Sequence, residues 1–101
     1  METSLIQETF QLINKDFELK TTEKVDLEDQ LIELLTPVIY QMLNRDFEKL
    51  LQICYRIDLD ENQLKYILHE SNPEHIASEL AKAITKRQMK KVEIRRKYSE
   101  S

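Results

Sequence analysis

The side chains best suited to chemistry flank one predicted turn. His69 and Glu70 precede residues 71–73, and Glu74 and His75 follow them. Imidazole and carboxylate groups are ligands for zinc and related metal ions. The spacing lacks the two histidines at i and i+4 of one helix that would place both ligands on one face. The helix dipole favours a histidine at the end of one helix and a glutamate at the start of the next. We therefore expect helix ends here and no metal site.

A second ligand-like pattern, Asp58, Asp60 and Asn62, has the alternating spacing that opens an EF-hand calcium loop. The sixth position of that loop is Gln63 where glycine is needed, and the twelfth is His69 where a bidentate glutamate is needed. The pattern is therefore better explained as a turn in which Asp60 caps the next helix.

The one cysteine, Cys54, shares a helical face with Leu50 and Ile57. A reactive thiolate requires electropositive, polar surroundings and a neighbouring base. We expect a buried thiol that packs as a small apolar side chain. No other group of residues has the spacing of a catalytic site, so we expect no catalytic residues and no cofactor.

The composition narrows the function classes further, because the 101 residues include no glycine. Phosphate-binding loops and dinucleotide-binding turns need glycine for close backbone approach, so both are excluded. Two-residue hairpins also depend on glycine, which argues against a β-meander.

Apolar residues recur at helical spacing along almost the whole chain, which is 41% hydrophobic and 34% charged. This pattern predicts an all-α protein, a compact bundle of about five helices with a long basic C-terminal helix. We expect a single helical domain over residues 1–101. Within it, residues 1–24 form an N-terminal helix and loop, and residues 85–101 form a basic helix end that projects or lies on the bundle's edge.

The first two helices are predicted from their caps and apolar stripes. Ser4 caps a helix whose buried face is Ile6, Phe10, Ile13 and Phe17, and the period is lost over residues 19–24. Asp26 caps a second helix with a buried stripe made of Leu27, Leu31, Leu34 and Leu35.

The sequence leaves undecided whether this second helix breaks at Pro37 and whether it breaks at residues 44–46. Pro37 either kinks a continuous helix or, with Thr36 as its cap, starts a new one. The stripe then keeps its phase through Ile39, Leu43, Phe47, Leu50, Cys54 and Ile57. The unbroken phase favours one helix across residues 44–46, with a fresh start at Asp46 as the alternative.

Asp60 and Asn72 are the predicted caps of the last two helices, and Pro73 takes the first helical position after Asn72. The last helix has its core face at Ile76, Leu80 and Ile84, and this row becomes basic at Arg87, Lys91 and Arg95. A weaker stripe consists of Ala77, Ala81, Thr85, Gln88 and Val92. We infer that this helix docks through its first three turns only.

Charge is distributed unevenly along the chain, whose formal net charge is −4. Residues 1–75 contain sixteen acids and seven bases (−9), and residues 76–101 contain three acids and eight bases (+5). Basic terminal turns are usually solvated and suit the helix dipole. The more specific hypothesis is that the last helix carries a contact surface for an acidic partner. The candidate residues of this surface are Arg87, Lys90, Lys91, Arg95 and Arg96.

Tyr55 and Arg56 flank the core stripe just before a turn. We expect Arg56 to pair with a nearby acid and Tyr55 to lie at the bundle's edge. Both residue types are frequent in interface hot spots, so both are candidates for a contact surface. The stretch from Arg45 to Ile84, with Asp46-Phe47 and Tyr55-Arg56-Ile57-Asp58, resembles a group of small uncharacterised helical bacterial proteins. That resemblance implies a compact all-α domain and no functional residues.

The sequence therefore predicts a non-catalytic helical module that contacts a protein partner or a second copy of itself. Nucleic-acid binding through the basic last helix is the alternative, although the acidic body disfavours it. The chain has no apolar run long enough to cross a bilayer, its first ten residues lack a signal peptide's basic and apolar regions, and its one cysteine cannot form an internal disulfide. We expect a cytoplasmic protein with no membrane partner.

Overall fold

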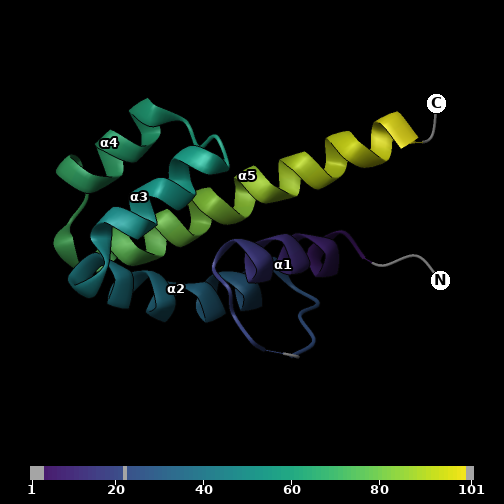
Figure 1. Ribbon diagram of the computed structural model, residues 1–101, viewed down its shortest axis with the longest axis horizontal. Helices are drawn as coiled ribbons and strands as arrows, with labels where there is room; N and C mark the ends of the chain where they lie inside the picture. The colour runs from purple at the N-terminus through teal and green to yellow at the C-terminus, as the bar shows by residue number, and fades with distance from the viewer. Residues whose placement is uncertain (1–3, 22, 100–101) are drawn as a thin grey trace.

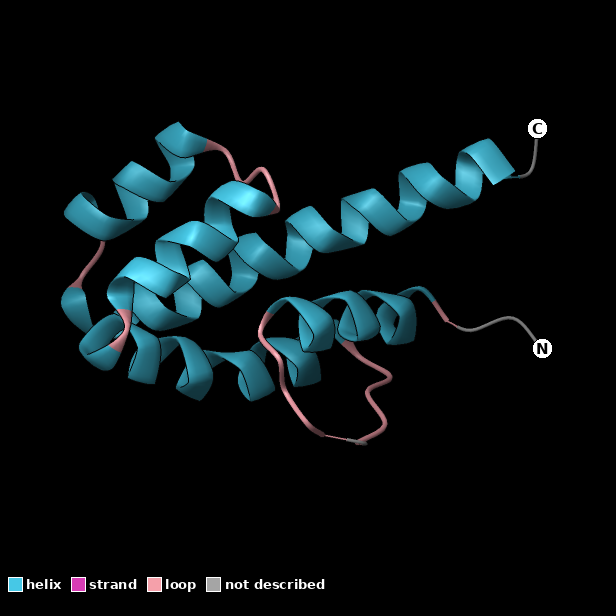
Figure 2. Cartoon of the chain, viewed as in Figure 1, coloured by secondary structure: helices cyan, strands magenta, loops and turns pink. Residues whose placement is uncertain are grey.

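The computed structural model describes residues 4–21 and 23–99, and these form five α-helices and one short 3₁₀ turn, with no strand (Figures 1 and 2). The predicted segments 1–24 and 85–101 also contain residues 1–3, 22 and 100–101, which lie outside the described residues. The all-α bundle predicted from the apolar period is confirmed. Its elements are α1 (Leu5–Asp16), α2 (Glu28–Arg45), α3 (Phe47–Arg56), α4 (Glu61–Glu70), η1 (Pro73–His75) and α5 (Ile76–Ser99).

The last helix, α5, is the element on which the bundle is built. Its 24 residues span about 36 Å, close to the molecule's longest dimension of 41 Å. Its most extensive contacts are with α2 and α1, and α4 also packs on it (Figure 1). A helix with contacts on several sides needs small residues, and Ala77, Ala81 and Ala83 are all buried.

The core is one cluster that draws on all five helices. Burying aliphatic side chains of this size contributes about 1.5–3 kcal/mol each to folding. The predicted stripes supply most of its members. Fully buried side chains from four of the helices are Ile13, Leu31, Leu35, Ile39, Leu50, Ile53, Leu80 and Ile84.

Three predicted caps are confirmed. The Ser4 hydroxyl accepts from the amide of Gln7 at 3.0 Å, and the Asp60 carboxylate accepts from the amides of Asn62 and Gln63. The Asn72 side chain accepts from the amide of Glu74 at 3.0 Å. Asn72 and the following proline start the short η1 turn, and α5 follows it directly.

The predicted start of the second helix is wrong by one residue. Leu27, not Asp26, is the N-cap of α2, and the side chain of Gln30 accepts from the amides of both residues at 3.1 and 3.0 Å. The prediction that Leu27 is buried is also wrong, because it is 62% exposed. Its backbone is extended (φ −120°, ψ 145°), so its side chain precedes the helix and does not share the helix's core face.

The structure shows a continuous helix at Pro37 and a break at Asp46. The helix α2 is continuous through Pro37, which is exposed, and the hydroxyl of Thr36 donates to the carbonyl of Ile32 at 2.7 Å. One helix across residues 44–46 is wrong, because Asp46 (φ −149°, ψ 56°) separates α2 from α3. This break moves Phe47 off the core face, and it is 42% exposed where the stripe predicted burial.

Two helices end in the left-handed backbone conformation without glycine. Glu18 (φ 54°) follows α1, and Asp58 (φ 63°) follows α3. After each, the chain folds back: the amide of Leu19 donates to the carbonyl of Asn14, and that of Leu59 to the carbonyl of Cys54. These six-to-one bonds, with the matching five-to-two bonds, form Schellman motifs, which normally place glycine at this position.

The helix α5 packs against the rest of the protein over a greater length than its strongest apolar row predicts. Gln88 and Val92 of the weaker stripe are buried, about one and two turns beyond Ile84 respectively. The amide of Gln88 donates to the carboxylate of Asp16, and Arg96 pairs with Glu8 at 3.2 Å, so α1 runs antiparallel to α5. The inference that α5 docks only through its first three turns is therefore wrong.

Candidate functional site

A groove of about 760 Å³ lies at the end of the molecule where α5 begins. It lies among the C-terminal part of α2, the helices α3 and α4, and the first turn of α5. We call it the aromatic groove, because Tyr40, Phe47 and Tyr55 line it. Its other lining residues are mostly apolar, namely Leu43, Leu51, Leu64, Leu68, Pro73, Ile76 and Ala77, with Asn44, Glu61, Lys65 and His69 as polar members.

The three aromatic side chains of the aromatic groove are unusually open to solvent. Tyr40 is 62% exposed, Tyr55 58% and Phe47 42%. Scattered exposed apolar residues are normal, but large ones gathered around one hollow indicate a contact site. Because Tyr40 is on α2 while the other two are on α3, the break at Asp46 is what brings them together.

The polar members of the groove stand at its edge. Glu61 and Lys65 form an ion pair of 3.6 Å across one turn of α4, and both side chains are about two-thirds exposed. An exposed pair of this kind adds little stability. His69 is exposed on the same helix, so the rim offers both charges and an imidazole around an apolar floor.

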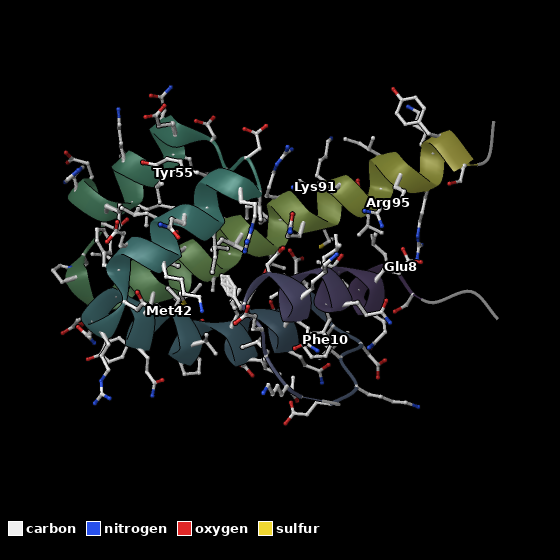
Figure 3. All side chains as sticks on the ribbon, in the orientation of Figure 1. Glu8, Phe10, Met42, Tyr55, Lys91 and Arg95 are labelled. Atoms are coloured by element: carbon white, nitrogen blue, oxygen red, sulfur yellow. The ribbon has the colours of Figure 1, made fainter. Side chains whose placement is uncertain are left out.

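Tyr55 and Arg56, the two candidate contact residues at the end of α3, have different roles. Tyr55 lies on α3 on the side of the molecule that holds α4 (Figure 3), and it lines the aromatic groove. Arg56 was expected to pair with a nearby acid, and that expectation is wrong. Its guanidinium donates to the backbone carbonyl of Asp16 at 3.2 Å, so it fastens the end of α1 to α3.

The predicted basic contact residues divide into two groups. Arg87 donates to the carbonyl of Ile57 at 3.2 Å and pairs with Asp58 at 3.4 Å, and Arg96 pairs with Glu8. These two arginines therefore bind acids and carbonyls of their own chain. Lys90, Lys91 and Arg95 form no ion pair with any described residue.

These three bases do not share one face. Arg95 lines a shallow hollow with Glu8, Gln11 and Val92, so it lies on the α1 side of α5, and Figure 3 shows it beside Glu8. Lys91, one helical turn before Arg95, adjoins that residue. Lys90 and Lys91 belong to the side of α5 that also carries Ile94, Lys97 and Tyr98. We call these five residues the open face of α5. Ile94 is 42% exposed and Tyr98 76%.

Sequence reasoning missed the exposure of Tyr40, Phe47 and Ile94. One signal was available for Tyr40, because it lies beside the apolar stripe and not on it. No comparable signal exists for Phe47, whose position on the stripe predicts burial.

The thiol of Cys54 is fully buried, as predicted, and this burial raises its pKa to about 11. Among the described residues, no three His, Cys, Asp or Glu side chains lie close enough together to hold a metal ion. None of the described helices combines the length and apolar character that crossing a bilayer requires.

Comparison with protein-family models, with curated proteins and with solved structures gave no match for this chain.

Proposed function

We propose that this protein is a non-catalytic helical interaction module that binds a partner protein through the aromatic groove. The observation that carries the proposal is the gathering of Tyr40, Phe47 and Tyr55, all 42–62% exposed, around one apolar hollow. Tyrosine is enriched among interface residues that dominate binding energy, and burying aromatic rings provides much of that energy.

An amphipathic helix is the ligand that this groove suits best. Helices bind one another by placing apolar side chains at i, i+3, i+4 and i+7 into a groove formed by other helices. The aromatic groove has helical walls, an apolar floor and charged residues at its edge, which is the distribution found in protein interfaces. We also propose a cytoplasmic location, consistent with a free thiol at Cys54 that forms no disulfide.

The proposal is tested by placing the photo-cross-linker p-benzoylphenylalanine at Tyr55 in the source cells. We expect a covalent adduct with a protein, identified by mass spectrometry, and loss of that adduct when Phe47→Ala removes an aromatic wall. The matched control is the same cross-linker at Tyr66, which is 64% exposed on α4 but does not line the groove. Equal adducts at both positions, or none at Tyr55, would contradict the proposal.

Nucleic-acid binding is the second candidate, supported by the net charge of residues 86–99, which contain seven bases and one acid (+6). Lysines on the open face could contact phosphates by charge alone. Retention on heparin at low salt, lost on charge reversal at Lys90 and Lys91, would support this function. Absence of retention would eliminate it.

A further inference from the structure

One helical row of α5 is covered at its start and uncovered at its end. Steps of four and three residues connect Ile76, Leu80, Ile84, Arg87, Lys91, Ile94 and Tyr98. Leu80 and Ile84 are buried, and Arg87 closes the covered part by donating to the carbonyl of Ile57 at the end of α3. Beyond Arg87 the row becomes the open face, where an apolar pair, Ile94 and Tyr98, is exposed one turn apart.

The aromatic groove and the open face stand at opposite ends of the same helix. Ile76, in the first turn of α5, lines the groove, and Ile94 is eighteen residues further along, at a distance of about 27 Å. A two-fold axis across the middle of α5 would place the end of one α5 beside the start of another. Both contacts would then form at once, which closes the assembly as a dimer.

The two segments that carry these surfaces are opposite in net charge. Residues 40–77, which carry the groove, contain seven acids and four bases (−3), whereas residues 86–99 contain seven bases and one acid (+6). Charges of opposite sign speed association and select the correct partner. The open face therefore suits the groove in apolar content and in position, and its lysines suit the net acidic segment around the groove.

We propose that a second copy of this chain occupies the aromatic groove, with Ile94 and Tyr98 of each protomer inserted between the groove residues of its partner. This inference rests on the proposed function, because it names the partner of the same groove. The lysines of the open face then lie over the acidic end of the other protomer, and the two α5 helices run antiparallel.

Sedimentation equilibrium of the purified chain tests the proposal first. We expect a dimer, twice the chain mass of 12.1 kDa, at concentrations of tens of micromolar. Raising the salt concentration from about 50 mM to about 500 mM is expected to weaken the dimer at least tenfold, because screening removes the charge attraction. A monomer at about 0.3 mM would overturn the proposal without the need for any variant.

A mixing experiment identifies the two surfaces. We expect Ile94→Ser/Tyr98→Ser and Phe47→Ser/Tyr55→Ser to be monomeric when each is studied alone, because neither pair of like chains retains an intact contact. Mixing them restores one of the two contacts, so a heterodimer weaker than the parent dimer should form. Leu27→Ser, which changes an apolar residue that is 62% exposed elsewhere, is the matched control and should dimerise like the parent.

Failure of this inference is distinguishable from failure of the proposed function. Variants are compared only after circular dichroism shows parental helix content, and the salt series on the parent chain decides the matter if a variant does not fold. A mixture that stays monomeric overturns the self-docking geometry. A monomeric parent whose Tyr55 cross-links to a different protein overturns self-docking and supports the groove as a partner site, whereas a monomeric parent with no adduct overturns both.

Discussion

Cys54 shows how burial alone decides the chemistry of a residue. It packs on the core stripe between Leu50 and Ile57, fully removed from solvent, and desolvation disfavours its thiolate. Its pKa rises from the usual 9.0 to about 11, so the thiol stays protonated at neutral pH. A nucleophilic or metal-binding role needs the thiolate, and the fold opposes its formation.

This pKa predicts a pH dependence of stability. Between pH 9 and 11 the unfolded chain loses the Cys54 proton while the folded chain keeps it, so the free energy of unfolding falls as pH rises through this window. The loss approaches about 1.4 kcal/mol per pH unit. Urea unfolding between about pH 8.5 and pH 10.5 measures it, and Cys54→Ala should show a shallower slope. Identical slopes in the two proteins would contradict the assignment.

Glu18 and Asp58 hold a backbone conformation that costs less energy for glycine. Both have positive φ at the end of a helix, where a Cβ atom crowds the neighbouring carbonyl. Aspartate tolerates this region better than glutamate does. In a chain without glycine, other residues must therefore adopt this conformation when a Schellman motif ends a helix.

Replacing Glu18 by glycine should stabilise the protein. Removal of the Cβ relieves about 1 kcal/mol of backbone strain, and the lost pair with Lys49 is exposed and contributes little. Thermal unfolding of Glu18→Gly should shift upward by several degrees. The control is Glu48→Gly within α3, which should destabilise the protein because glycine lowers helix propensity. A loss of stability in Glu18→Gly would show that the strain is absent.

At the scale of the elements, α2 demonstrates how packing keeps a helix continuous through a proline. Pro37 lacks the N–H that would donate to the carbonyl of Glu33, and its ring crowds that carbonyl. The helix nevertheless continues, because Leu35 and Ile39 on either side are both buried. The proline therefore reduces the stability of α2 without ending it.

Pro37→Ala should raise the free energy of unfolding by about 1–3 kcal/mol, because it restores a helical hydrogen bond at an exposed position. Chemical denaturation measures the gain. Pro73→Ala is the matched control, since that proline occupies the first position of η1, where its ring suits the backbone and no N–H is needed. It should be neutral or slightly destabilising. An equal response of the two prolines would contradict this account.

At the scale of the whole molecule, the charge asymmetry is partly neutralised within the chain. Basic residues of α5 reach acidic or carbonyl groups on α1 and at the end of α3, through Arg96 with Glu8 and Arg87 with Asp58. The acidic first half and the basic last helix are thus packed against each other. Among the candidate contact bases, Lys90, Lys91 and Arg95 form no ion pair with a described residue.

This division predicts different costs for neighbouring bases. Arg87→Ala should lower the free energy of unfolding by about 1–2 kcal/mol, because its side chain is largely covered and donates to the carbonyl of Ile57. Lys90→Ala should change it by less than about 0.5 kcal/mol, since Lys90 is exposed and unpaired with described residues. Urea unfolding of the two variants in parallel checks this. Equal costs would mean that Arg87 does not fasten α3 to α5.

Features that depend on neighbours in sequence were predictable. Ser4, Asp60 and Asn72 cap helices by bonding to amides two or three residues on, and the apolar period identifies most of the core. The absence of glycine excluded phosphate-binding loops for the same local reason.

Tertiary structure alone decided the rest. The break at Asp46 turned Phe47 from a predicted core residue into a wall of the groove, although the apolar phase continues across it. The groove draws on α2, α3, α4 and α5, and Asp16 and Glu8 of α1 determine which stripe of α5 is covered. Hydrophobic periodicity shows which side chains can be buried, but burial requires a partner surface, and long-range packing alone supplies that surface.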